Sequence, residues 1–171
     1  MTDTRSTDRT DADRTDTHTD RALSDVLDGL QFAMVATADG TGTWRARPLA
    51  LAHHDGDVLS FLVSVEADWV EALELTGSPT TVTFSDPGKN TYVAVQGAAR
   101  TVEDRARIAA MWNPGAGAYF DGPEDPQVRM LDVDVAYGEY WDGPHGRVGA
   151  LLQLAAKALG KETGTQGDVV V

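Results

Sequence analysis

The sequence predicts a mainly β protein, a six-stranded antiparallel barrel with a few flanking helices. Short runs rich in β-branched and aromatic residues recur along the chain, and turn-forming Gly, Pro, Asn and Asp residues separate them. Residues 81–102 contain two such runs joined by a Pro-Gly turn, which is the pattern of a β-hairpin. The chain of 171 residues is long enough for one hydrophobic core with tails.

Composition excludes several classes of function. The chain has no cysteine, which rules out disulfides, thiolate metal sites and cysteine nucleophiles. Its formal net charge of -13 argues against nucleic acid and anionic membranes as partners, because both require a basic surface. The longest apolar stretch, residues 148–159, is interrupted by Gln153 and Lys157 and is too short to span a bilayer. Because the N-terminus lacks the apolar run of a signal peptide, we expect a cytoplasmic protein.

The chain divides into three parts. Residues 1–21 are rich in Thr, Asp and Arg and nearly free of apolar residues, so we expect a disordered tail. Residues 22–145 are expected to form the barrel domain. Residues 146–171 are expected to pack on the barrel as an amphipathic helix over 146–159 followed by a polar tail.

The first half of the barrel domain begins with an amphipathic helix, predicted over residues 22–30. A meander of three strands follows, because Asp- and Gly-rich turns separate three apolar runs. These strands are predicted at residues 32–38, 44–53 and 58–64. A helix over residues 66–76 comes next and ends at Gly77, a residue typical of helix C-termini.

The second half begins with the hairpin, whose strands are predicted at residues 81–85 and 91–102. Gly97 in the second strand indicates a bulge or a bend. A helix over residues 104–112 follows, and Thr101 and Asp104 resemble a capping box at its start. The last long strand is predicted at residues 127–141, with one face formed by Leu131, Val133, Val135 and Tyr137.

Several short runs occur along the chain in a fixed order. They are Arg47-Pro48-Leu49, Ser85-Asp86-Pro87, the run from Tyr92 to Gly97, the run from Glu103 to Ile108, Met111-Trp112-Asn113-Pro114, Tyr119-Phe120, Glu139-Tyr140-Trp141-Asp142 and Glu162-Thr163-Gly164-Thr165. In their order and spacing these runs resemble the pyridoxamine 5'-phosphate oxidase-like split β-barrels, and within them the flavin-binding general stress proteins. The resemblance covers the chain from about Ser24 to its C-terminus.

The resemblance implies a homodimer that binds flavin mononucleotide (FMN) in two clefts at the subunit interface. One subunit contributes the Arg-Pro strand and a phosphate site between the third strand and the helix after it, and its partner covers the cleft with the segment around Trp112. The implied activity is that of a flavin-dependent oxidoreductase of unknown substrate, because the cofactor itself carries the redox chemistry. The implied cofactor-binding residues are Arg45, Arg47, Pro48, Leu49, Ser64, Trp69 and Trp112.

The chain departs from the family pattern at the phosphate site. The pattern has Thr at the end of the third strand and Ser and Lys at the start of the helix, whereas this chain has Val63, Ala67 and Trp69. Each lost hydrogen bond to the phosphate costs about 1.5–3 kcal/mol. Three such losses are expected to weaken FMN binding by roughly a thousandfold or more. Glu66 and Asp68 at the helix start would also repel the anion.

Alternative interpretations of the individual candidates stay open. Arg45 and Arg47 form either a solvated strand face or an anion site, and Trp69 either fills the phosphate pocket or stacks on an aromatic ligand. Trp112 is either a core or dimer-interface residue or the cover of a flavin ring. The histidine pair that begins at His53 has no third ligand nearby, so we expect no metal site.

The sequence therefore supports two hypotheses about function. The first is an FMN-binding, oxidoreductase-like protein of the general stress type. The second is a non-catalytic dimer that keeps the split barrel, has lost the FMN phosphate site, and binds another small ligand or none. A different redox cofactor, such as a deazaflavin or haem, is a third option that the sequence does not select.

Overall fold

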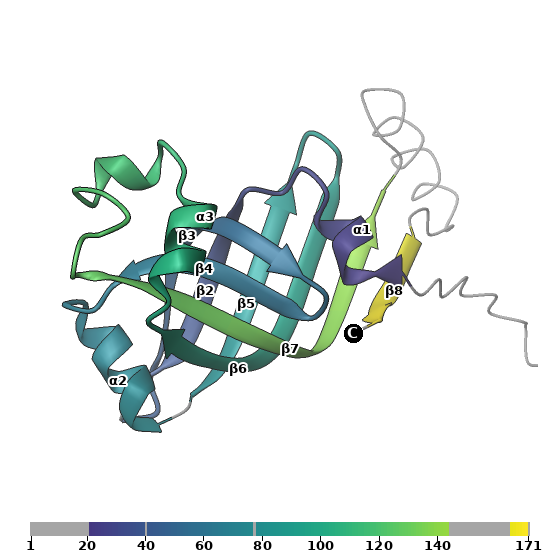
Figure 1. The fold of residues 1–171 in the computed structure, drawn as a ribbon. Helices are drawn as coiled ribbons and strands as arrows, with labels where there is room; N and C mark the ends of the chain where they lie inside the picture. Colours follow the sequence, from purple (N-terminus) through teal and green to yellow (C-terminus); the bar gives the residue numbers. More distant parts are fainter. Residues whose placement is uncertain (1–20, 40, 77, 144–164, 171) are drawn as a thin grey trace, which may run out of the picture.

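The computed structural model describes residues 21–39, 41–76, 78–143 and 165–170. Within them, six strands close into an antiparallel barrel in the order β7-β4-β3-β2-β5-β6, and β6 pairs back onto β7 (Figure 1). The strands are β2 (Phe32–Ala38), β3 (Trp44–Asp55), β4 (Val58–Ser64), β5 (Pro79–Asp86), β6 (Thr91–Val102) and β7 (Val128–Asp142). The predicted six-stranded antiparallel barrel is confirmed. The predicted tail over residues 1–20 and the predicted helix over 146–159 lie outside the described residues.

Two short strands extend the sheet beyond the barrel. β8 (Thr165–Val170) pairs antiparallel with the end of β7, and β1 (Arg21–Ala22) pairs parallel with β8, so Arg21 belongs to the sheet rather than to the tail. The tail predicted after the helix over 146–159 thus contains a strand, β8, which the sequence did not indicate. Long β7 offers β8 an edge to pair with, and Val169 is buried there against Gly138.

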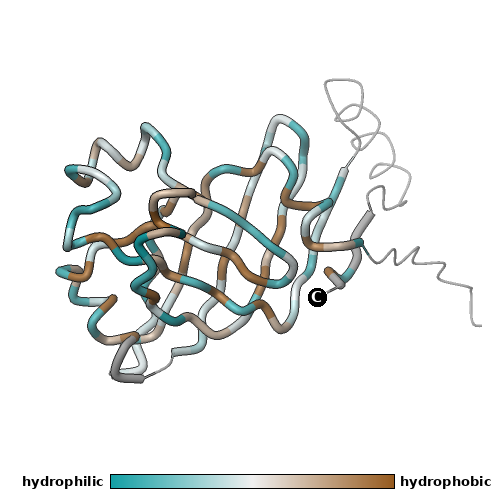
Figure 2. Tube along the Cα trace, in the orientation of Figure 1, coloured by the Kyte–Doolittle hydropathy of each residue, from teal (hydrophilic) through white to brown (hydrophobic). Residues whose placement is uncertain are grey.

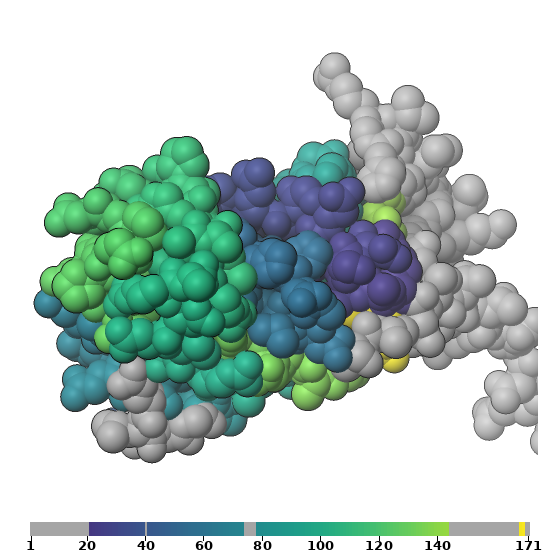
Figure 3. Space-filling model, in the orientation of Figure 1, coloured from purple at the N-terminus to yellow at the C-terminus, as the bar shows by residue number. Residues whose placement is uncertain are grey.

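Short helices flank the barrel on two sides. They are α1 (Leu23–Leu27), α2 (Asp68–Thr76), α3 (Arg105–Met111) and the 3-10 helix η1 (Ala116–Ala118). Figure 1 shows α2, α3 and η1 on one side and α1 on the opposite side, next to β1 and β8. In Figure 3, the green surface of α3 and the loop after it covers one end of the barrel. None of the helices in the part of the chain described has the length and apolar character needed to cross a bilayer.

Three helices differ from the prediction at their ends, and α2 begins at Asp68 rather than at residue 66. α1 stops at Leu27 instead of reaching residue 30, because Gly29 adopts a left-handed φ of +77°. α3 is capped by Asp104, whose carboxylate accepts the N–H of Arg107 at 3.0 Å. The capping role predicted for Thr101 is wrong, because Thr101 still belongs to β6.

The core has two parts. The larger lies inside the barrel, where the alternating side chains of the strands point inward and Val35, Val82 and Val95 are fully buried. The smaller lies between α3 and the outer face of β7, where Ile108 packs with Val128. The first part of β7 is consequently buried on both faces, and apolar residues recur along the strands in Figure 2.

A bulge at Gly97 confirms the break predicted in the second hairpin strand. Gln96 pairs with Tyr137 and Gly97 pairs with Val135, so Ala136 has no partner on β6. This extra residue reverses the alternation along β7. Tyr137 is therefore 46% exposed, and the prediction that it shares the inward face of Val135 is wrong.

Candidate functional site

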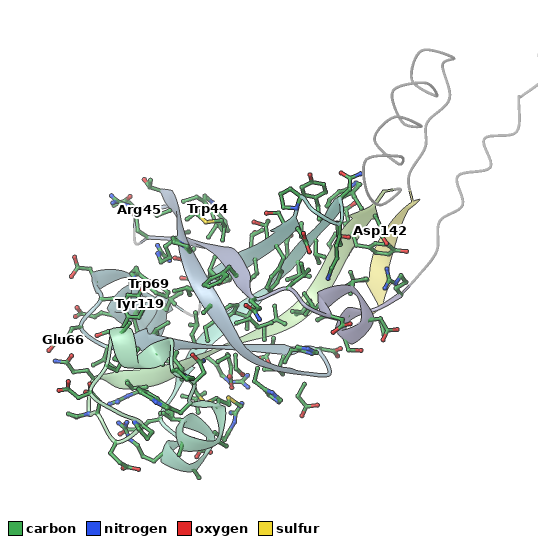
Figure 4. The ribbon with its side chains drawn as sticks, turned by 90° about the horizontal axis from the view of Figure 1, so that it is seen from above. Trp44, Arg45, Glu66, Trp69, Tyr119 and Asp142 are labelled. Carbon is green, nitrogen blue, oxygen red and sulfur yellow. The ribbon has the colours of Figure 1, made fainter. Side chains whose placement is uncertain are left out.

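A cavity of about 710 Å³ opens between the β2–β3 hairpin and the start of α2. Arg45, Arg47, Ala67 and Trp69, which the sequence analysis brought together, all line it. Figure 4 shows Arg45 at the end of β3, with Glu66 and Trp69 on the α2 side. We call this space the Arg47 cavity; its complete lining is Asp39, Arg45, Ala46, Arg47, Glu66, Ala67, Asp68, Trp69 and Ala72.

The strand register explains why the two arginines lie together. Arg47 stands opposite Val35, and Arg45 stands opposite Thr37. Val35 and Thr37 point into the barrel, so the arginines share the inward face of the sheet near the end of the hairpin. Arg47 is thus half-buried on the inward face, while the side chain of Arg45 remains 72% exposed at the rim.

Arg47 is held by an aromatic ring and a hydroxyl. Its Cζ lies 4.0 Å from the centroid of the Trp69 ring, which is cation–π geometry and contributes about 0.5–2 kcal/mol. Its Nη1 donates a hydrogen bond of 2.9 Å to Oγ1 of Thr37. Partial burial, and then the charge of Arg45, lower the pKa of Arg47 below its ordinary value. Sequence reasoning missed Thr37, although the alternation of β2 places it on the inward face.

Arg45 pairs with Asp39 at the turn of the hairpin. The Nε of Arg45 lies 3.4 Å from Oδ2 of Asp39. Asp39 also accepts hydrogen bonds from the hydroxyl and N–H of Thr41 and from the N–H of Thr43. These bonds, the Thr41 hydroxyl first, lower the pKa of Asp39, and Arg45 adds a smaller effect in the same direction. Asp39 also lines the Arg47 cavity, a position that the sequence did not indicate.

The Asp39 turn yields a pH prediction. The carboxyl of Asp39, followed by NMR in a pH titration, is expected to have its midpoint below the ordinary value of 3.8. A lowered native pKa stabilises the folded state above the unfolded-state pKa, and this contribution disappears as pH falls through the native pKa. Thr41→Val should move the midpoint upward, because it removes the strongest of the hydrogen bonds. A midpoint at or above the ordinary value in the parent protein contradicts the prediction.

The start of α2 brings carboxylates rather than phosphate ligands to the cavity. Glu66 accepts a hydrogen bond of 2.8 Å from Nε2 of Gln127, and its N–H donates to Oγ of Ser64 at 3.2 Å. Asp68 is the first residue of α2. A helix N-terminus attracts anions, but here the side chains of the helix and of the preceding turn supply that negative charge.

The remaining predicted residues do not share this cavity. Leu49 packs against the main core, and Val63 is buried in it. Trp112 packs in the smaller cluster, with its ring 6.4 Å from that of Phe120. Trp112 is thus partly buried against its own chain, and its contacts with a partner subunit or a flavin stay predictions. Within the described residues, no group of three metal-ligating side chains exists.

Pro48 lines a second space, an apolar groove of about 390 Å³ on the outer face of the barrel. Phe32 is 69% exposed there, Met34 43% and Tyr92 40%. Met34 stands opposite both Pro48 and Thr83, so β2, β3 and β5 contribute neighbouring positions. Sequence reasoning missed this face, although the uninterrupted apolar run of β2 could have indicated burial on both sides. The lining of this outer groove is Phe32, Ala33, Met34, Pro48, Thr83, Phe84, Ser85, Tyr92, Val93, Ala94 and Trp141.

Comparisons with known proteins agree with this fold. A protein-family model described as pyridoxamine 5'-phosphate oxidase like matches residues 18–165. Protein bli-3 of Neurospora crassa is 27% identical over 145 residues, which are 78% of this chain and 69% of that protein.

Solved structures give the same result. A putative general stress protein 26 from Jannaschia sp. CCS1 has a TM-score of 0.71 at 24% identity, and the match covers 86% of this chain and 94% of that one. The general stress FMN/FAD binding protein from Xanthomonas citri has a TM-score of 0.61 at 23% identity, over 71% of this chain and 86% of that one. At these identities the likeness establishes the fold.

Proposed function

Because the chain belongs to the pyridoxamine 5'-phosphate oxidase-like family, we propose that it binds a flavin in a cleft formed by two copies of the barrel. The observation that carries this proposal is the outer groove, where exposed aromatic and apolar side chains lie next to the strand that bears Arg47. Pro48 lines the groove and Arg47 lines the cavity, so consecutive residues of β3 face the two spaces from opposite sides of the strand. The solved relative described as FMN/FAD binding supports the choice of ligand.

A second copy of the chain is the proposed partner on the outer groove. Phe32 and Met34 of β2 and Tyr92 of β6 are exposed there, although both strands are paired with neighbours on both sides. Exposed aromatic residues grouped on one face are typical of protein interfaces. A homodimer would cover these side chains and enclose a flat ring between the two barrels.

FMN itself fits this site only in part. The aromatic groove suits the ring, and Arg47 supplies a cation in the cavity on the other face of β3. The phosphate end does not fit, because Val63 is buried in the core and the indole of Trp69 lies against the cation. A bound flavin would supply redox chemistry of the oxidoreductase type, and this chain would bind and orient the ring.

The second candidate is a split-barrel dimer without flavin chemistry. The observation that favours it is the Arg47–Trp69 stack, in which the indole ring covers one face of the guanidinium that would otherwise meet a phosphate. Under this candidate the Arg47 cavity takes another small ligand or none.

A titration and a mass measurement test the proposal together. We expect the purified protein to have twice the 18.3 kDa chain mass in analytical ultracentrifugation and to quench the fluorescence of added FMN or riboflavin at micromolar concentration. Met34→Glu should abolish both properties, because it places a charge in the outer groove. The matched control is His53→Glu, which adds a carboxylate at an exposed position of the same hairpin outside both spaces.

The outcomes separate the two candidates. A dimer that binds neither flavin supports the second candidate. A monomer, or a Met34→Glu protein that still dimerises, contradicts the proposed interface.

A further inference from the structure

We infer that the Arg47 cavity selects against phosphate, so that the flavin bound by this chain is one without a terminal phosphate, riboflavin being the simplest example. The part that concerns the ring rests on the proposed function. The part that concerns phosphate rests on the lining of the cavity alone.

The first argument is that Arg47 is already engaged on two sides. One face of its guanidinium lies over the Trp69 ring, and Nη1 donates to Thr37. Phosphate prefers two parallel N–H bonds from the flat guanidinium fork. A fork that includes Nη1 would cost Arg47 its hydrogen bond to Thr37, and the Trp69 ring blocks approach to the guanidinium from one face. The remaining N–H groups suffice for single hydrogen bonds to hydroxyl groups.

The second argument is the charge of the lining. The cavity contains two guanidinium groups and three carboxylates, those of Asp39, Glu66 and Asp68. Arg45 is paired with Asp39 and largely exposed, so solvent screens what remains of its attraction. A phosphate monoester carries a charge of about -1.5 to -2 at pH 7. It would meet Glu66 and Asp68, which are also exposed so that solvent weakens their repulsion, and Arg47 as the more buried of the two cations.

The third argument is that a neutral polyol matches this mixture. A hydroxyl both donates and accepts hydrogen bonds. It can therefore donate to a carboxylate such as Asp68 and accept from Arg47 at the same time. The ribityl chain of riboflavin carries several hydroxyls and ends without a charge, so it satisfies the lining that a dianion does not.

The test compares riboflavin and FMN on the full chain by fluorescence titration. We expect the parent protein to bind riboflavin at least as tightly as FMN. Trp69→Lys should raise the affinity for FMN by about tenfold or more, since it adds one charge-assisted contact and frees Arg47, and should leave riboflavin affinity unimproved. The double substitution of Glu66→Gln and Asp68→Asn leaves the Arg47–Trp69 stack intact. It should also raise the affinity for FMN relative to that for riboflavin.

His53→Lys is the matched control, because it adds the same charge to β3 at an exposed position away from the cavity. It should leave the ratio of the two affinities unchanged. A parent protein that binds FMN about tenfold more tightly than riboflavin overturns the inference and leaves the proposed function standing.

If the parent binds neither flavin, the proposed function fails and inorganic phosphate decides the inference alone. Phosphate binding measured by calorimetry should then increase in Trp69→Lys over the parent, which supports selection against phosphate by the stack. Equal phosphate binding in both proteins overturns the inference.

Discussion

Replacing Gly97 with alanine is expected to destabilise the barrel by about 3 kcal/mol or more. A Cβ at this position would overlap the carbonyl oxygen of Asp134 and lie 2.8 Å from its carbonyl carbon. The obstacle is backbone of the adjacent strand, so no side-chain rotation can relieve it. Either β6 and β7 separate at the bulge or the register of β7 changes, and both break the closure of the barrel.

The matched control is Gly117→Ala in η1, where an added Cβ has no neighbour within 4 Å. Thermal unfolding should show a melting temperature lower by about 6–12 °C for Gly97→Ala and a change of about 2 °C or less for Gly117→Ala. Insoluble expression of Gly97→Ala beside a soluble Gly117→Ala protein would agree with the expectation. Equal melting temperatures for the two variants would show that the bulge tolerates a side chain.

Replacing Asp132 with alanine is expected to cost about 3 kcal/mol. Asp132 is fully buried on β7, where it accepts a hydrogen bond of 2.7 Å from Oγ of Ser60. Its two carboxylate oxygens also meet Nη1 and Nη2 of Arg107 at 3.0 and 3.4 Å. The substitution leaves the buried Ser60 hydroxyl without its acceptor and frees the arginine that ties α3 to the barrel. Because the side chain of Arg107 is 39% exposed, water offsets part of its loss.

Asp134→Ala is the matched control, two residues along the same strand. The Asp134 side chain is 45% exposed and pairs with Arg100, so its loss should cost about 1 kcal/mol or less. Urea unfolding of both variants measures the difference. A double-mutant cycle with Arg107→Ala isolates the pair, and a coupling energy near zero would contradict an anchoring role for Asp132.

The Asp132 network also connects the fold to the proposed site. Arg107 lies in α3, and Trp112 directly follows that helix. The family resemblance assigns the segment around Trp112 to the cleft of the partner subunit. A loosened α3 is therefore expected to weaken flavin binding as well as stability, whereas Asp134→Ala should leave flavin binding unchanged.

Local patterns were enough to predict most of the barrel. β2, β4 and β6 agree with the prediction residue for residue, because alternating apolar residues and turn residues define a strand without reference to the rest of the chain. The bulge followed from a single glycine inside a strand pattern. Of the residues that the resemblance singled out, Arg45, Arg47, Ala67 and Trp69 line one cavity, whereas Pro48, Leu49 and Trp112 lie elsewhere.

The sequence by itself thus determined the six barrel strands, their order along the chain and the family. Only the tertiary structure decided that Arg47 stacks on Trp69 and that β8 joins β7. These contacts join segments that are separate in the chain, and their geometry depends on where α2 and the strand edges lie in space. The periodicity of a sequence predicts which face of an element a residue occupies, but not which distant residue it contacts there. The ligand preference of the cavity depends on those contacts.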